Sequence, residues 1–361
     1  MPDSSAVSAS IRAVREPALR RSLDELGMVR EIEVKRKGQV RVGIAVPTPQ
    51  WDAEPLGRSI ADAAKAHDGV GEVAVDVAIM TGNEQAALAE RLTGGPDQVG
   101  GPGSRTRVIT VASGKGGVGK SSVTANTAVA LARAGHDVAV VDADVWGYSI
   151  PKMLGVDQPP QAVGELIVPP VANEVRAISM DFFVGADQAV IWRGPMLHKA
   201  LEQFLGDVFW DEPDFLLLDM PPGTGDVAIS ISQFLPRSQA VIVTTPQITA
   251  QRVAKRAALM AEKVNQEVVG VVENMSWFTG DDGTRYDIFG SGGGAALAEE
   301  LDVPLLGSVP LQRGLRDGAD RGEPVALTEP ESEAAVAFDE IARNLVDLRP
   351  RVRMHPELVI N

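Results

Sequence analysis

The chain has 361 residues, which is long for one domain, and 44% of them are apolar, so we expect one large domain with a smaller companion. Its formal charge of −15 disfavours a surface that holds nucleic-acid phosphates. It contains no cysteine, which excludes disulfide bonds, thiolate catalysis and any metal or iron–sulfur site whose ligands are its own thiolates.

The hydropathy pattern does not favour a membrane protein. No apolar run approaches the roughly 20 residues that cross a bilayer, and the N-terminal segment lacks the apolar core of a secretion signal. We therefore expect a cytoplasmic protein with neither a membrane nor nucleic acid as a partner.

Residues 8–91 predict a small α/β domain in the order helix, two strands, helix, strand. Leu19, Leu23 and Leu26 are spaced as on one face of a helix, and alternating apolar residues indicate the strands. The strands are expected at 29–34, 40–46 and 73–79, and the second helix at 54–66. Residues 92–106 contain five glycines and two prolines, so we expect them to form a flexible linker.

Residues 107–349 predict an α/β domain in which strands alternate with helices. This order is typical of a mostly parallel sheet with helices on both faces, as in the P-loop NTPases. Further strands are expected at 138–141, 215–218, 241–244, 268–272 and 305–309, and helices at 250–264, 295–301 and 332–348. Residues 350–361 contain two prolines and are expected to form an irregular tail.

The first strand of this domain leads into a glycine-rich turn and then a helix. In RVITVASGKGGVGKSSVTANTAVA, residues Gly114, Gly119, Lys120 and Ser121 fit G-x-x-x-x-G-K-[ST], the phosphate-binding loop. The alternative is a glycine-rich turn that matches by chance, at a frequency on the order of one per cent. We expect the phosphates of a nucleotide to be held by this loop, Gly114, Gly116, Gly117, Val118, Gly119, Lys120, Ser121 and Ser122; the resemblance described below adds Lys115 and implies that the nucleotide is ATP.

Aspartates follow two of the predicted strands, where ligands of a parallel sheet bind. Asp219 ends one strand, and Asp142 and Asp144 end another. We expect Ser121, Asp142 and Asp219 to hold Mg²⁺, and an acid at the end of the second strand to orient an attacking water. The alternative for each aspartate alone is a helix cap or a turn.

Several motifs together resemble one known family. The segments GKGGVGKSS, DADVWGYSIPKMLG, WRGPM, LDMPPGTGD, TTPQ, GVVENMS and FGSGGG are similar to the Mrp/ApbC branch of the MinD/ParA ATPases, which is implicated in carrying iron–sulfur clusters to apoproteins. The resemblance extends from Val108 to about Arg343. The first domain, with EPALRRSLDELGMVREIEV and VGEVAVDVAIM, is similar to a small domain found in iron–sulfur assembly factors.

The resemblance implies a Mg²⁺-dependent ATPase that works as a homodimer. It implies that Lys115 reaches the partner's nucleotide, that Lys120 acts in its own subunit, and that both are catalytic. Asp144 is implied to position the hydrolytic water, Asp219 to complete the Mg²⁺ shell, and Asn274 to contact adenine.

The chain departs from this family at the cargo site. Many members carry Cys-x-x-Cys after ENMS, where this chain has SWFTGDDGTRYDIFG with Gly280 and Gly283 near the expected positions. The small domain often has a cysteine where Trp51 stands here. No residue of this chain is therefore expected to be an iron–sulfur ligand, and any bound cluster needs other ligands.

Three functions remain open on these grounds. The first is an ATP-dependent carrier that delivers clusters to apoprotein clients, with thiolates supplied by a partner. The second is a nucleotide-dependent switch or adaptor that has lost cluster binding. The third is a positioning ATPase like MinD or ParA, which the non-amphipathic tail and the acidic charge disfavour.

Overall fold

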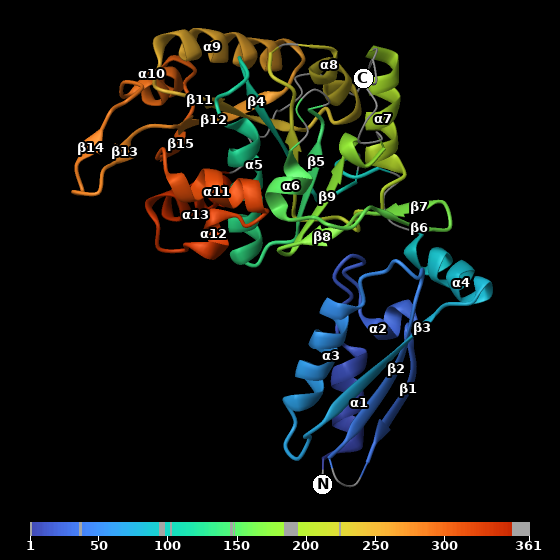
Figure 1. Ribbon diagram of the computed structural model, residues 1–361. Coiled ribbons are helices and arrows are strands. Elements are labelled where there is room, and N and C mark those ends of the chain that lie inside the picture. Colours follow the sequence, from blue (N-terminus) through green and yellow to red (C-terminus); the bar gives the residue numbers. More distant parts are fainter. Residues whose placement is uncertain are drawn as a thin grey trace, which may run out of the picture.

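The protein consists of a small N-terminal domain and a larger domain built on one sheet (Figure 1). The computed structural model describes residues 2–35, 38–93, 98–101, 103–144, 147, 149–183, 194–223 and 225–348. The predicted architecture, a mostly parallel sheet with helices on both faces preceded by a small α/β domain, is confirmed.

The small domain packs its helices against a three-stranded sheet of order β1-β2-β3, in which β1 and β2 are antiparallel and β2 and β3 are parallel. Its elements are α1 (Ser4–Arg12), α2 (Leu23–Leu26), β1 (Val29–Val34), β2 (Val40–Val46), α3 (Glu54–Lys65), β3 (Val73–Ile79) and α4 (Gly82–Leu92). Leu19, Leu23 and Leu26 are fully buried, as their spacing predicted. The helix expected there is only the short α2, and sequence analysis missed α1, which Asp3 caps.

The large domain contains an eight-stranded sheet of order β15-β12-β11-β4-β10-β5-β9-β8, in which every neighbouring pair except β8 and β9 is parallel. The strands are β4 (Arg107–Ser113), β5 (Val138–Asp142), β8 (Val171–Ala172), β9 (Val175–Ser179), β10 (Phe215–Asp219), β11 (Gln239–Thr244), β12 (Glu267–Asn274) and β15 (Leu305–Val309). Its central strands are buried along their whole length, which explains their continuous apolar runs.

Helices cover both faces of this sheet (Figure 1). One face carries α5 (Lys120–Arg133) and α13 (Glu333–Asp347), and the other carries α7 (Gly194–Gly206), α8 (Asp226–Phe234), α9 (Ile248–Lys263) and α10 (Gly293–Glu300). The remaining elements are α6 (Ile150–Leu154), β6 (Gln161–Val163), β7 (Leu166–Val168), η1 (Met180–Phe183), β13 (Phe278–Thr279), β14 (Arg285–Tyr286), α11 (Arg313–Arg321) and α12 (Val325–Thr328). The tail 350–361 lies outside the described residues.

The two domains are joined by apolar and ionic contacts. Val163, Val168 and Phe209 of the large domain belong to the apolar cluster of the small one. The Arg21 guanidinium lies 2.7 Å from the Asp211 carboxylate and over the Phe209 ring. Within the segment expected as a linker, Val99 is buried against the large domain. The domain boundaries remain a prediction, but this part of the segment is packed.

A buried carboxyl group stabilises the loop that makes these contacts. The Glu16 side chain is 2% exposed and accepts hydrogen bonds from the Leu19 backbone N–H at 2.6 Å and from the Trp51 indole N–H at 3.1 Å. Burial raises the pKa of Glu16 to about 7, against the lowering effect of these donors. The group is therefore protonated in the folded chain at pH values where it is ionised in the unfolded chain.

Glu16→Gln is expected to flatten the pH dependence of stability. Between pH 5 and pH 8 the folded wild-type chain loses a proton that the unfolded chain has already lost, so its stability falls as pH rises, by roughly 3 kcal/mol from this group. The neutral amide removes most of this slope. Thermal unfolding at both pH values measures it, with the exposed Glu90→Gln as the control; an unchanged slope in Glu16→Gln would contradict the assignment.

Candidate functional site

The glycine-rich turn lies between β4 and α5, at the carboxyl edge of the sheet. Gly119, directly before α5, has φ +79°, and a Cβ there would lie 2.1 Å from the Asn274 Nδ2. Gly114 has no room for a side chain either, because its Cβ would lie 2.1 Å from the Val253 carbonyl carbon of α9. Close packing therefore requires glycine at both positions, as the motif predicted.

A buried cluster of one cation and two carboxylates lies beside this turn. The Lys120 Nζ is 2.6 Å from Asp219 Oδ2 and 3.5 Å from Asp144 Oδ2. The Ser121 hydroxyl donates to the same Asp219 Oδ2 at 2.6 Å. Lys120 is 6% exposed and Asp219 is fully buried, so water screens their attraction little, and removal of either partner would leave a buried unpaired charge. The structure thus brings the start of α5 together with two aspartates, Asp144 and Asp219, that lie far from it in the sequence.

This cluster has the donors that a nucleotide and its metal ion need. The Lys120 ammonium group, which forms an ion pair with Asp219, carries the positive charge that a phosphate needs. The Ser121 hydroxyl and the Asp219 carboxylate lie next to one another, and both are hard oxygen ligands of the kind that Mg²⁺ prefers. The residues present therefore fit a Mg²⁺–nucleotide complex.

Asp142 ends β5, and its carboxylate is surrounded by donors from the loop that follows and from Ser179. Its Oδ2 accepts from the Ser149 and Ile150 backbone N–H groups, at 3.0 and 3.2 Å, and from the Ser179 hydroxyl at 3.2 Å. Its Oδ1 accepts from the Asp144 N–H at 3.2 Å. Burial and the nearby Asp219 raise the pKa of Asp142 to about 7. Asp142 therefore anchors the loop that carries Asp144. Its role as a Mg²⁺ ligand remains a prediction.

Asn274 ends β12 and packs directly on the turn. Its Nδ2 donates to the Val118 carbonyl oxygen at 2.9 Å. Within the described residues its buried Oδ1 has no hydrogen-bond partner. An unpaired buried acceptor is costly, and it suits a ligand that brings an N–H donor such as the exocyclic amino group of adenine. The adenine contact remains a prediction that this geometry fits.

The other predicted loop residues surround the cluster without joining it. The Lys115 Nζ lies 3.3 Å from Gln247 Oε1, at the start of α9. Val118 is buried, and the Ser122 carbonyl oxygen accepts from the Asn126 side chain within α5. Gly116 and Gly117 lie in the turn between β4 and α5. Within the described part of the chain, Lys115 forms no ion pair with Asp144 or Asp219, the carboxylates beside Lys120.

Sequence analysis missed one residue that contacts the cluster. The Thr124 hydroxyl lies 2.7 Å from Asp219 Oδ1, and the side chain is fully buried. Thr124 follows Lys120 by four positions in α5, so both side chains lie on the same face of the helix. That spacing was available in the sequence as a signal.

The segment after Asn274 forms a small hairpin instead of a loop of metal ligands. Phe278 pairs with Tyr286 and Thr279 with Arg285, so that Gly280 and Gly283 lie in the turn. The Glu333 carboxylate at the start of α13 accepts from Thr279 at 2.6 Å, Arg285 at 2.8 Å and Trp277 at 3.2 Å. These hydrogen bonds, that of Thr279 first, lower the pKa of Glu333. An ionised Glu333 thus holds the hairpin against the start of α13.

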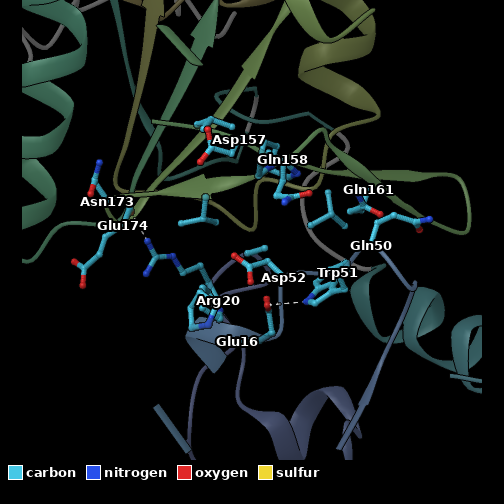
Figure 2. Close-up of a pocket in the computed structure, with 18 of the residues that line it drawn as sticks. Glu16, Arg20, Gln50, Trp51, Asp52, Asp157, Gln158, Gln161, Asn173 and Glu174 are labelled. Carbon is cyan, nitrogen blue, oxygen red and sulfur yellow. Dashed lines mark hydrogen bonds between the residues drawn. The ribbon is translucent and has the colours of Figure 1, made fainter. Parts of the chain in front are cut away.

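A second concave site lies between the domains and was not predicted. It is a cavity of about 600 Å³ (Figure 2). Its lining comes from residues 15–20 and 50–59 of the small domain, including the start of α3, and from loops and short strands within residues 155–174 of the large domain. Trp51, at the position where the resemblance led us to look for a cysteine, lies in its wall with Glu16. Sequence analysis could not find it because it depends on how the domains pack.

The described residues contain neither a helix that could span a membrane nor a ready cluster of metal-ligating side chains. Among the described helices, none is long and apolar enough to cross a bilayer. The described residues contain no group of three or more His, Asp or Glu side chains arranged to hold a metal ion.

Two family descriptions match the chain. Residues 104–346 match the NUBPL iron-transfer P-loop NTPases, and residues 4–77 match a domain described as an iron–sulfur cluster assembly protein. Two curated relatives are both named iron–sulfur cluster carrier protein. The one from Mycobacterium leprae is 43% identical over 96% of this chain and 94% of its own length. The one from Synechocystis is 42% identical over 94% of this chain and 96% of its own.

Solved structures resemble the large domain. A nucleotide-binding protein from Archaeoglobus fulgidus in complex with ADP is 34% identical, with a TM-score of 0.56, over 64% of this chain and 91% of its own. The septum site-determining protein MinD from Pyrococcus horikoshii, complexed with Mg-ADP, is 27% identical with a TM-score of 0.50, over 67% of this chain and 96% of its own.

Proposed function

Because this chain belongs to the NUBPL iron-transfer P-loop NTPase family, we propose that it is a cytoplasmic, ATP-hydrolysing carrier of iron–sulfur clusters that depends on Mg²⁺. The observation that carries the nucleotide part is the buried cluster of Lys120, Ser121 and Asp219 beside the glycine-rich turn. The relatives' name, and the assembly domain matched by residues 4–77, support the cluster part.

ATP binding exchanges the partners within this cluster. The γ-phosphate offers Lys120 a more concentrated negative charge than Asp219 does, so we expect its ammonium group to move to the phosphate oxygens. Ser121 and Asp219 are then free to hold Mg²⁺, which neutralises charge on the β- and γ-phosphates. The backbone N–H groups of the turn and the start of α5 bind the phosphates, and Asn274 Oδ1 accepts from the adenine amino group.

Hydrolysis requires a water in line with the bond to ADP. Asp144 lies two residues after β5, with its Oδ2 3.5 Å from the Lys120 Nζ. This proximity supports the proposal that its carboxylate orients that water beside the γ-phosphate. The water oxygen bonds to the γ-phosphorus, the bond to the ADP oxygen breaks, and the water proton leaves with phosphate. Asp142 holds the loop that carries Asp144.

Dimerisation is proposed from the position of Lys115. Its ammonium group contacts Gln247 and takes no part in the cluster of its own subunit, so it is available for a nucleotide on a second copy of the chain. Two nucleotides between two subunits would then open and close the homodimer as ATP is hydrolysed.

This chain lacks the cysteine ligands that the resemblance leads one to expect for an iron–sulfur cluster. It has no cysteine, and the hairpin between β13 and β14 is held by Glu333 through its own side chains. We therefore propose that the thiolates come from a partner, either an assembly protein or an apoprotein client. The same two observations favour the second candidate, a nucleotide-dependent switch or adaptor that no longer binds a cluster.

Anaerobic reconstitution distinguishes these two functions. The full chain is incubated with Fe²⁺ and sulfide, with and without ATP, and with and without glutathione as a soluble thiol. After desalting, iron, sulfide and the visible absorption spectrum are measured. We expect no retained cluster without thiol and a stoichiometric cluster with glutathione, because thiolate ligands are what the chain lacks. A chain that hydrolyses ATP but retains no cluster under any of these conditions contradicts a carrier that accepts thiolates from a small thiol and favours the switch or adaptor.

A further inference from the structure

Asp219 accepts hydrogen bonds on both of its carboxylate oxygens. Lys120 and Ser121 donate to Oδ2, each at 2.6 Å, and Thr124 lies 2.7 Å from Oδ1. All three donors come from the first turns of α5, and Asp219 is fully buried at the end of β10. The two oxygens of this carboxylate are therefore held from one helix.

The Thr124 hydroxyl has one proton and two acceptors within reach. Besides Asp219 Oδ1 at 2.7 Å, it lies 3.0 Å from the Lys120 carbonyl oxygen one helical turn earlier. A charged acceptor at the shorter distance makes the stronger hydrogen bond. We conclude that the hydroxyl donates to Asp219, which fixes the rotation of that carboxylate.

The three donors differ in what happens to them when nucleotide binds. Lys120 is needed by the phosphates and Ser121 by the metal ion, so both are drawn away from Oδ2. Thr124 lies deeper in α5, is fully buried, and has no part in binding the nucleotide, so it stays on Oδ1. Oδ2 is then the oxygen left facing the metal position.

We propose that Thr124 is a positioning residue for the ATPase reaction, which holds Asp219 Oδ1 so that Oδ2 faces Mg²⁺. This inference rests on the proposed Mg²⁺-dependent ATP binding. Partners that orient a metal ligand in this way change metal affinity or activity about 10- to 100-fold when they are removed. The effect of Thr124 should therefore appear in the Mg²⁺ dependence and not in the affinity for the free nucleotide.

The same helix offers a matched control. Thr127 is also buried in α5, at 3% exposure, but within the described residues its hydroxyl has no hydrogen-bond partner. Threonine to valine removes the hydroxyl at nearly constant shape at either position. A general effect of this substitution on α5 would appear in both variants, whereas a role in positioning Asp219 would appear only at Thr124.

The test compares Thr124→Val, Thr124→Ser and Thr127→Val with the wild-type full chain. A fluorescent ATP analogue is titrated without Mg²⁺, and Mg²⁺ is then titrated at a fixed concentration of that analogue; thermal unfolding checks the fold. We expect Thr124→Val to raise the half-saturating Mg²⁺ concentration about tenfold or more. Thr124→Ser and Thr127→Val should stay close to the wild type, and binding without Mg²⁺ should be unchanged in all variants.

The outcomes separate this inference from the proposed function. A wild-type chain that shows no Mg²⁺-dependent nucleotide binding overturns the proposed function and the inference with it. A wild-type chain that binds Mg²⁺-nucleotide, with Thr124→Val equal to Thr127→Val, overturns the inference alone. If Thr124→Val does not fold, Thr124→Ala replaces it, and restoration of the Mg²⁺ dependence by serine but not by alanine is the decisive comparison.

Discussion

Lys120→Ala is expected to abolish productive ATP binding, lowering the affinity by about a hundredfold or more. The ammonium group is the buried cation of the cluster, and ATP would bring its phosphates to it. A buried charge that loses its partner costs roughly 3–5 kcal/mol, which corresponds to a factor of about 10² to several times 10³ in binding. Equilibrium binding of a fluorescent ATP analogue measures the loss.

The control for this variant is Lys115→Ala. The Lys115 ammonium group contacts Gln247 outside the cluster, so its removal should leave binding to one chain nearly unchanged while it suppresses hydrolysis. Normal turnover in both variants would contradict the proposed roles of the two lysines. Thermal unfolding of Lys120→Ala without nucleotide separates lost binding from lost stability, since Asp219 keeps Ser121 and Thr124 as donors.

The glycine-rich turn between β4 and α5 could be predicted from the sequence because the glycines that it requires and the lysine that follows them lie close together in the chain. Gly114 and Gly119 occupy positions where a Cβ would collide with neighbouring atoms, and Lys120 follows at the start of α5. The order of the motifs along the chain identified the family, and the comparisons confirm it. Continuous apolar runs predicted the central strands correctly because parallel strands are covered on both faces.

The roles of the aspartates could not be separated by sequence alone. Asp142 and Asp219 both end buried strands, yet one is surrounded by backbone N–H groups of its own loop and the other by side chains of α5. The position of an aspartate at the end of a strand predicts which edge of the sheet it lies on. It does not predict which N–H or O–H groups donate hydrogen bonds to its carboxylate. The position of Thr124 four residues after Lys120 is visible in the sequence, but its contact with Asp219 is not, because the two residues lie 95 positions apart.

Contacts between distant segments were also beyond the sequence pattern. Helix α1 is not such a case, because its N-cap Asp3 is a local signal in the sequence. By contrast, the attachment of the hairpin to Glu333, and the cavity beside Trp51, depend on how separate units pack together. Sequence analysis recognised the missing cysteines but could not show that side chains of the hairpin itself are engaged by Glu333.

Asp144→Ala is expected to separate ATP binding from hydrolysis. The Asp144 carboxylate is nearly buried at 7% exposure, and it lies 3.5 Å from the Lys120 ammonium group, farther than that of Asp219. Lys120 and Asp219 remain in the variant, so nucleotide should bind with an affinity close to that of the wild type. Loss of the group that orients the water should lower single-turnover hydrolysis by about 10² to 10⁴.

A chain that binds ATP and cannot hydrolyse it should accumulate in its nucleotide-bound form. If that form is the proposed homodimer, sedimentation of Asp144→Ala with Mg²⁺ and ATP should show twice the mass of the nucleotide-free chain. Asp157→Asn, at an exposed position beside the interdomain cavity, is the control and should behave as the wild type. Full hydrolysis in Asp144→Ala would assign the water to another group, with Asp142 the first to test because it holds the same loop.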